Sequence, residues 1–264
     1  MSGPYAASAT PIPERAEPPR SRDFASMRVS LAPAFILHRR PYLNTSLLLE
    51  AFGREHGRIG LVARGAVSRR SRLKGLLQPF VPLLLSWTGA GELATLTAAE
   101  EVGRPAPLPP KRVLAGLYAN ELLVRLLPRQ DPQPGLFTAY ETLLAELATM
   151  PSEEPSLRRF EKKLLEELGY GLTLDHDAAS GAPILAEECY RYVLDRGPLA
   201  ASQTQTGVPI SGRSLLALRD GIPAEPAILK EIKRLTRAAL TEQLRGRALK
   251  TRELYRVRQE SRSE

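Results

Sequence analysis

Six cations lie between His56 and Gly91, in a stretch that contains no Asp or Glu. They are Arg58, Arg64, Arg69, Arg70, Arg72 and Lys74. Clustered Lys and Arg bind phosphate backbones because each neutralised phosphate releases a condensed counterion, and this attraction requires no particular base sequence. A short basic run taken alone is equally typical of a solvated surface. Because acids are absent from the whole stretch, we favour a polyanion such as nucleic acid as its partner.

A second group of cations lies inside an acidic region. From Glu141 to Glu188 there are eleven acids and four bases. The bases are Arg158, Arg159, Lys162 and Lys163, and at helical spacing beside them are Leu157, Phe160 and Leu164. Such a mixture of cations and apolar side chains could hold an acidic, hydrophobic peptide, but it is also typical of a solvated helix face.

A third basic zone runs from Lys230 to Arg258, with ten bases and three acids. An ordinary solvated helix with a frayed end would have the same composition. The sequence therefore leaves open whether this zone binds DNA.

Catalytic motifs are missing from the sequence. It contains no GxxxxGK[ST] phosphate loop, no GxGxxG after a strand and no GxSxG elbow. A two-metal nuclease needs carboxylates beside its phosphate-binding cations, and the acid-free stretch supplies none. The closest approach to a metal-ligand cluster is Asp175-His176-Asp177, which we interpret as a polar junction between a helix and a loop. We predict a protein that is not an enzyme and that needs no cofactor.

Composition is that of a soluble, basic chain, with 264 residues and a net charge of +8. The single cysteine, Cys189, excludes an internal disulfide. No apolar run approaches the roughly 20 residues of a membrane span, and the N-terminus lacks the apolar core of a secretory signal. We therefore expect a cytoplasmic protein without membrane contacts.

Five short apolar runs between residues 28 and 103 predict strands separated by turn residues. The predicted strands are Leu31–Leu37, Ser46–Phe52, Arg58–Ala63, Pro82–Trp87 and Glu92–Thr97. Five strands in so short a segment indicate a small barrel of the oligonucleotide-binding (OB) type, whose surface suits single strands. Residues 1–27 mix Pro, Ala, Ser and charges without periodicity, which predicts a disordered tail.

A proline-rich linker at residues 104–110 precedes a second domain, residues 111–264, that we predict to be all-helical. Three apolar stripes indicate its first helices. They are Leu114, Leu117, Tyr118 and Leu122, then Leu136, Phe137, Tyr140, Leu144 and Leu147, then Leu157, Phe160, Leu164 and Leu168. Shorter helices are expected over Glu187–Leu194 and Ser211–Arg219, and a longer one over Glu225–Leu244. The fold class is therefore α+β, with an N-terminal OB barrel followed by helices.

An ordered set of motifs runs along most of the chain. In the first half the motifs are AFILHRRPY from Ala34, TSLLLE from Thr45, HGRIGLVARGA from His56 and SRLKGLLQPF from Ser71. In the second half they are LYANELL from Leu117, LRRFE from Leu157, LGYG from Leu168 and GRALKTRELYR from Gly246. In this order the motifs resemble those of the bacterial RecO family of DNA-repair recombination mediators, and the resemblance covers roughly residues 33–256.

The resemblance implies a protein that binds single- and double-stranded DNA and anneals complementary strands. Such proteins act with RecR, and in some cases RecF, to help RecA replace single-stranded-DNA-binding protein (SSB), and some bind the acidic C-terminal tail of SSB. A nucleoid-associated location in the cytoplasm would follow. The candidate DNA contacts are Arg39, Arg40, Arg58, Arg64, Arg69, Arg70, Arg72 and Lys74. The candidate residues for the SSB tail are Leu157, Arg158, Arg159, Phe160 and Lys162.

One departure from the family concerns zinc. Many relatives carry a cysteine zinc site in the helical domain, whereas this chain has Asp177 at the matching place and keeps only Cys189. A closed zinc site needs four Cys or His ligands, so we expect the chain to fold without metal. Two other functions remain open: an RNA-binding OB protein, since phosphate grooves do not by themselves distinguish RNA from DNA, and an adaptor that contacts only proteins.

Overall fold

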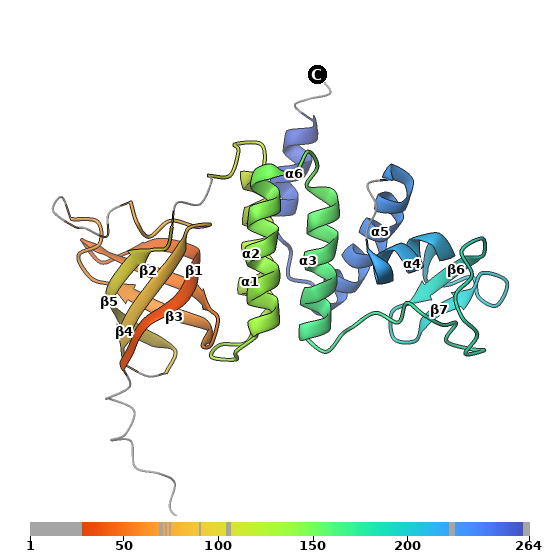
Figure 1. Cartoon of the computed structure of the whole chain (residues 1–264), viewed down its shortest axis with the longest axis horizontal. Coiled ribbons are helices and arrows are strands. Elements are labelled where there is room, and N and C mark those ends of the chain that lie inside the picture. Colours follow the sequence, from red (N-terminus) through yellow and green to blue (C-terminus); the bar gives the residue numbers. More distant parts are fainter. Residues whose placement is uncertain are drawn as a thin grey trace, which may run out of the picture.

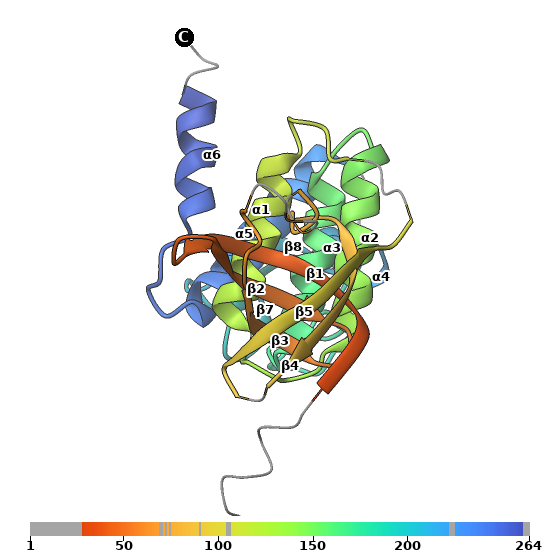
Figure 2. The same ribbon diagram turned by 90° about the vertical axis from the view of Figure 1, so that its left-hand side faces the viewer.

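The computed structural model describes residues 28–68, 71, 73, 75–89, 91–103, 107–221 and 225–260, with side chains as far as residue 255. A barrel forms one end of the molecule, helices form the middle, and a small sheet lies at the other end (Figure 1). Viewed from the barrel end, the barrel lies in front of the helices and the last helix projects above it (Figure 2). The expected tail at residues 1–27 falls outside the described residues.

The barrel is closed, and its strand order is β1-β2-β3-β5-β4. Its strands are β1 (Arg28–Tyr42), β2 (Ser46–Gly53), β3 (Gly57–Ala63), β4 (Pro82–Thr88) and β5 (Leu93–Glu101). Neighbouring strands are antiparallel except for the parallel pair β3 and β5. Inward-facing side chains alternate along each strand, so that Leu49, Leu61 and Leu85 are fully buried in the barrel core. The predicted five-stranded barrel is confirmed.

Strand β1 is longer at both ends than the sequence predicted. Its first half pairs with β4 from Arg28 to Phe35, and its second half pairs with β2 from Ala34 to Tyr42. The register shifts between Val29 and Ala32 and again between Ile36 and His38. Such irregularities bend a strand, which lets one long strand close a barrel by pairing on both sides.

Six helices follow the barrel in the described part of the chain. They are α1 (Val113–Leu126), α2 (Pro134–Thr149), α3 (Glu154–Glu167), α4 (Gly212–Asp220), α5 (Pro226–Gln243) and α6 (Lys250–Glu260). The first three helices lie where the apolar stripes predicted them, and most stripe residues are buried, whereas Leu114, Leu117 and Leu168 are half-buried. Pro134 begins α2, where a fixed φ suits the first turn and no amide donor is lost. Helix α6 lies in the part predicted to be helical, but the sequence did not predict it as a separate helix.

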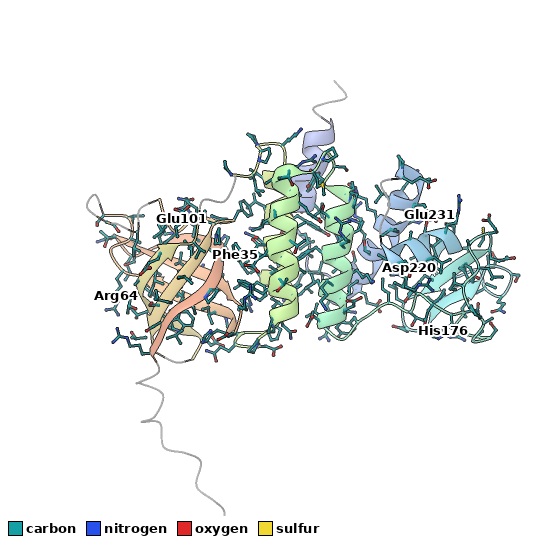
Figure 3. The ribbon with its side chains drawn as sticks, viewed as in Figure 1. Phe35, Arg64, Glu101, His176, Asp220 and Glu231 are labelled. Carbon is teal, nitrogen blue, oxygen red and sulfur yellow. The ribbon has the colours of Figure 1, made fainter. Side chains whose placement is uncertain are left out.

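The barrel and the helices share one hydrophobic core. Phe35 and Phe52 project from the barrel toward the helices, and Figure 3 shows Phe35 at this boundary. The ring of Phe35 lies 5.4 Å from that of Phe137 and 5.1 Å from that of Tyr140. The amide of Asn120 donates to the carbonyl of Leu37 at 2.8 Å, which satisfies polar groups inside this boundary.

The last part of the chain contains a small antiparallel sheet of order β7-β6-β8. Its strands are β6 (Cys189–Val193), β7 (Gly197–Ala200) and β8 (Val208–Ser211). The helix expected over Glu187–Leu194 is therefore wrong. Tyr190 and Tyr192 are buried while the residues between and beside them are not, which is the period of a strand rather than a helix. The fold class is confirmed, and this sheet is a local correction to the expected all-helical second half.

The sheet packs against α4 and α5 through a third core, which includes Tyr192, Leu215 and Ile232. Burial raises the pKa of the Tyr192 hydroxyl to about 12. Among the described helices, none has the length and apolar character needed to cross a membrane.

Candidate nucleic-acid and peptide sites

Three candidate DNA-binding cations are exposed on the barrel. Arg39 and Arg40 lie near the end of β1, and Arg64 directly follows β3. Within the described part of the chain none of the three forms an ion pair. Figure 3 shows Arg64 on the side of the barrel that faces away from the helices. Their charges are therefore available to a polyanion.

Arg58 occupies a different environment. Its guanidinium pairs with Glu50 at 3.0 Å and donates through Nε to the carbonyl of Leu127 at 3.0 Å. The second oxygen of Glu50 pairs with Arg129 from the α1–α2 loop at 2.5 Å. Glu50 thus forms ion pairs with one arginine of the barrel and with one of the helical region, and we call this contact the Glu50 junction. Arg58 belongs to the junction, whereas Arg39, Arg40 and Arg64 form no ion pair among the described residues.

The junction brings two turns into close contact. Gly57 has φ +62°, and a Cβ there would lie 2.1 Å from the carbonyl oxygen of Asp131. Only glycine fits both the backbone conformation and the space. The other predicted DNA contacts, Arg69, Arg70, Arg72 and Lys74, lie outside the described residues.

A pocket of 410 Å³ opens between α1, α3, α5 and α6. Its walls combine cations with apolar and aromatic side chains, and they include two acids. The lining residues are Tyr118, Glu154, Leu157, Arg158, Lys233, Arg237, Arg252, Glu253 and Tyr255. The four cations outnumber the two acids, so the pocket suits an anionic ligand with an apolar part.

Arg158 is almost fully buried in the wall of this pocket. Its guanidinium pairs with Glu161 at 3.0 Å, and the Glu161 side chain is 0% exposed. The hydroxyl of Tyr118 donates to the same carboxylate at 2.7 Å. Burial, with the nearby Glu161 charge, raises the pKa of the Tyr118 hydroxyl far above its usual range. Tyr118 therefore acts as a neutral donor that helps to hold the buried ion pair.

Two guanidinium groups at the pocket have buried N–H donors without a partner among the described residues: Arg158 at Nε, and the half-buried Arg252 at Nε and Nη2. A buried donor left without an acceptor costs free energy, and such donors are normally satisfied. An anion in the pocket would supply acceptors for donors of this kind. Arg237 adds an exposed cation, and Lys233 pairs with Glu154 at 2.6 Å.

Helix α6 carries Arg252 and Tyr255, and it is positioned by an acid from another helix. The carboxylate of Glu121 on α1 accepts hydrogen bonds from the backbone amides of Lys250 and Thr251 at 3.0 and 2.9 Å. The Thr251 hydroxyl donates at 2.8 Å. Burial alone would raise the pKa of Glu121, but these hydrogen bonds and Arg125 lower it below its usual value. Glu121 thus serves as a charged cap for the first turn of α6.

The structure divides the five residues predicted for the peptide site. Leu157 and Arg158 line the pocket, whereas Arg159, Phe160 and Lys162 are not among its lining residues. Arg159 pairs with Glu146 on α2 at 2.7 Å, and Lys162 pairs with Glu166 at 3.6 Å. Phe160 is buried in the core beside Tyr140.

Several lining residues were not predicted for this site. Lys233, Arg237 and Arg252 belong to the third basic zone of the sequence, which gave no indication that it meets the LRRFE motif in space. Tyr118 lies within the LYANELL motif and Tyr255 within GRALKTRELYR. The sequence does contain the motifs LRRFE, LYANELL and GRALKTRELYR, but they are far apart along the chain. Only the fold brings residues from all three to one pocket.

Asp177 stands where the family resemblance leads us to expect a cysteine in relatives with a zinc site. Its carboxylate accepts hydrogen bonds from neighbouring residues instead. It accepts from the amides of Ala179, Ser180 and Ala200 and from the Ser180 hydroxyl, at distances of 2.8 to 3.0 Å. Burial alone would raise its pKa, but these hydrogen bonds lower it. Folding without zinc stays a prediction, and stoichiometric zinc in protein purified without added metal would contradict it.

These features define a class of two-part binding protein: a small barrel with exposed cations, joined through a shared core to a helical region with a cationic pocket. Residues 27–104 match the family described as "Recombination protein O N terminal", and residues 109–253 match "Recombination protein O C terminal".

The chain is also similar to proteins named DNA repair protein RecO. It is 48% identical over 240 residues to that of Methylococcus capsulatus, covering 91% of this chain and 98% of the relative. Identity is 46% over 243 residues for Nitrosococcus oceani, with coverage of 90% and 99%. For Aliivibrio salmonicida it is 43% over 235 residues, with coverage of 89% and 99%. The chain belongs to the RecO family of DNA repair proteins, which confirms the resemblance seen in its motifs.

Proposed function

We propose that this protein is a non-enzymatic recombination mediator of DNA repair, working in the cytoplasm at the nucleoid. In this proposal it binds single- and double-stranded DNA and anneals complementary strands. It acts with RecR (and RecF) to help RecA load on DNA coated with SSB.

The observation that carries the proposal is the presence of two separate cationic sites on one body with a shared core. Arg39, Arg40 and Arg64 are exposed on the barrel without ion pairs among the described residues. The pocket of Arg158, Arg237 and Arg252 lies in the helical region. One site suits the phosphates of DNA, and the other suits a shorter anion with an apolar part.

The chemistry of the pocket supports an acidic, hydrophobic peptide such as the C-terminal tail of SSB. Carboxylates of the tail would accept from the unpaired N–H groups of Arg158 and Arg252, and apolar side chains would lie against Leu157 and Tyr255. Charge-assisted hydrogen bonds of this kind are about twice as strong as neutral ones.

The two sites would work together by raising effective concentration. Contact with the SSB tail would keep the barrel close to coated DNA, so that a weak barrel–DNA contact becomes in effect intramolecular. Cations on the barrel would lower the repulsion between two strands that are being paired. Neither step requires catalytic chemistry.

The experiment that tests the proposal measures annealing of complementary oligonucleotides coated with SSB that has or lacks its acidic tail. Wild-type protein is expected to accelerate annealing only when the tail is present. The double variant Arg237→Ala/Arg252→Ala should lose most of this tail-dependent acceleration and about tenfold or more in affinity for a tail peptide, since each charged hydrogen bond contributes roughly 1.5–3 kcal/mol.

The matched control is Arg159→Ala, which removes the same charge from the neighbouring helix face outside the pocket. It should leave peptide binding unchanged. Binding of naked DNA should survive in both variants. Equal loss of peptide binding in the pocket variant and the control would contradict the pocket assignment, and a complete absence of DNA binding at low salt would favour a protein adaptor instead.

A further inference from the structure

The turn between β1 and β2 exposes apolar side chains at the tip of a hairpin. Leu43 is 77% exposed, more than any other large hydrophobic residue that the structure describes, and its neighbour Tyr42 is 40% exposed. Leu43 also has φ +53°, in the left-handed region that suits Gly or Asn and strains a leucine. Its side chain is not part of a core cluster, so it is available for contact with a ligand.

A third apolar residue joins the tip from a separate segment. The amide of Val67 donates to the carbonyl of Thr45 at 3.0 Å, which ties the chain after β3 to the β1–β2 turn. The Val67 side chain is 46% exposed. Tyr42, Leu43 and Val67 are called the apolar tip below.

Cations surround the apolar tip. Arg40 lies two residues before Tyr42, and Arg39 precedes it on the opposite face of β1. Leu47 pairs with Ala63, which places Arg64 beside the start of β2. The sequence has no acid from Arg39 to Leu49 or from His56 to Gly91. Glu50, the acid next along β2, is already paired with Arg58 and Arg129.

We propose that the apolar tip contacts unstacked bases of single-stranded DNA, with Leu43 inserted at a base step, while Arg39, Arg40 and Arg64 bind the flanking phosphates. This inference rests on the proposed function, because it names the part of the strand that the barrel contacts. Apolar wedges that separate stacked bases recur in DNA-binding proteins, and an exposed tyrosine offers a face on which any base can stack. Bases held out of their own stack are free to meet a complementary strand.

The surroundings favour a nucleic acid over a protein as the occupant. A stable protein interface buries about 800 Å² on each partner, which three side chains at a hairpin tip do not approach. Unpaired cations at the rim of an apolar surface complement alternating phosphates and bases along a strand.

The test uses Leu43→Gly, alone and combined with Tyr42→Ser, in the full chain. Glycine accepts the left-handed backbone, so the turn should fold at least as well as before. The DNA probe is a single-stranded oligonucleotide containing a fluorescent adenine analogue whose emission is quenched by stacking. Wild-type protein should raise this emission on binding. The double variant should lose the rise and bind about tenfold more weakly, since a base stacked on an aromatic residue contributes a factor of roughly 5 to 150.

Leu31→Gly is the matched control. Leu31 lies on the same strand, is 48% exposed and also has a left-handed φ of +51°, but it lies on the part of β1 that pairs with β4, away from the hairpin tip. The same substitution there should change neither the emission nor the affinity.

The salt dependence separates failure of this inference from failure of the proposed function. Removing apolar groups should leave the slope of log affinity against log salt unchanged, whereas replacing Arg39, Arg40 and Arg64 by Gln should flatten it by about one unit for each lost phosphate contact.

If the tip variant keeps wild-type affinity and emission while the arginine variant loses binding, the base contact is refuted and the DNA site stands. If the tip variant instead loses binding to RecR or to a second copy of the chain, the tip is a protein site. If the arginine variant also binds normally, Arg39, Arg40 and Arg64 do not contact the DNA, and the base contact fails together with the part of the proposed function that rests on these three cations.

Discussion

Arg158 belongs both to the pocket and to the core. Its guanidinium is 3.0 Å from the carboxylate of Glu161, in a place where the two side chains are 3% and 0% exposed. Glu161 also accepts from the hydroxyls of Tyr118 and Thr236 at 2.7 and 2.6 Å. Removing the arginine would leave a carboxylate without a counter-charge and without access to water, so Arg158 is a stability residue as well as a candidate ligand residue.

We therefore expect Arg158→Ala to lower the free energy of unfolding by about 3–5 kcal/mol. The double variant Arg158→Met/Glu161→Gln should recover most of that loss, because it removes both charges and keeps the volume. Urea unfolding measures both values, and Arg159→Ala, at an exposed pair, should cost at most about 1 kcal/mol. Similar small losses for Arg158→Ala and Arg159→Ala would show that the buried pair contributes little.

The sequence predicted part of this site for a clear reason. Consecutive residues on a helix point about 100° apart, so a pocket meets only part of the helix surface, here the part that carries Leu157 and Arg158 but not Arg159. The sequence alone does not say which part that is. The partners that decide it, Thr236 and Arg252, are more than seventy residues away. The composition of the LRRFE motif therefore identified α3 as a candidate site. Only the packing showed which side of α3 lines the pocket.

At the scale of elements, α6 shows how a short polar helix is held in place. Its sequence is strongly polar, and a helix of 11 residues has little stability by itself. Glu121 compensates by accepting from two amides and one hydroxyl of the first turn. The sequence did not predict where α6 begins, because its cap lies 129 residues earlier in the chain.

Glu121→Gln should loosen α6 without touching the pocket lining. Loss of a charged cap costs roughly 1 kcal/mol, so amide hydrogen exchange over residues 250–260 should become faster and the tail peptide should bind more weakly.

The pKa of Glu121 is lowered in the folded state, so its contribution to the stability of α6 depends on pH. This contribution is fully present above the ordinary carboxylate range and is lost as the pH falls through the lowered pKa. The wild-type protein should therefore lose α6 protection on acidification, and Glu121→Gln should show a weaker pH dependence. Unchanged exchange in the variant would mean that other contacts hold α6.

In the small sheet the sequence prediction gave the wrong type of element, a helix where the structure has strand β6. The run Cys189–Val193 carries a strand signal, with tyrosines at every second position, but it is only five residues long and a helix of the same length would show similar composition. The five barrel strands were predictable because glycine and proline turns separate longer apolar runs. Clear turns, more than propensity, made the first half easier to predict than the second.

At the scale of the whole molecule, the barrel and the helices are joined by a core and by the Glu50 junction. Phe35, Phe52 and Phe137 belong to one cluster, and Glu50 links Arg58 to Arg129. A joint with this much buried contact should behave as one folding unit, whereas domains joined only by a linker move and unfold separately. Such a joint also fixes the geometry between the barrel cations and the pocket, on which simultaneous binding of DNA and an SSB tail depends.

The single tryptophan makes this rigidity measurable. Trp87 is buried in the barrel core, so its fluorescence reports on the barrel, whereas far-ultraviolet circular dichroism is dominated by the helices of the second half. We expect both signals to follow one unfolding curve in urea. Leu85→Ala, which creates a cavity in the barrel core away from the helices, should cost about 2–5 kcal/mol and move both curves together. If only the fluorescence curve moves, the barrel unfolds independently and the two sites are not held at a fixed distance. The gain in affinity from binding DNA and the SSB tail together must then come from flexible tethering.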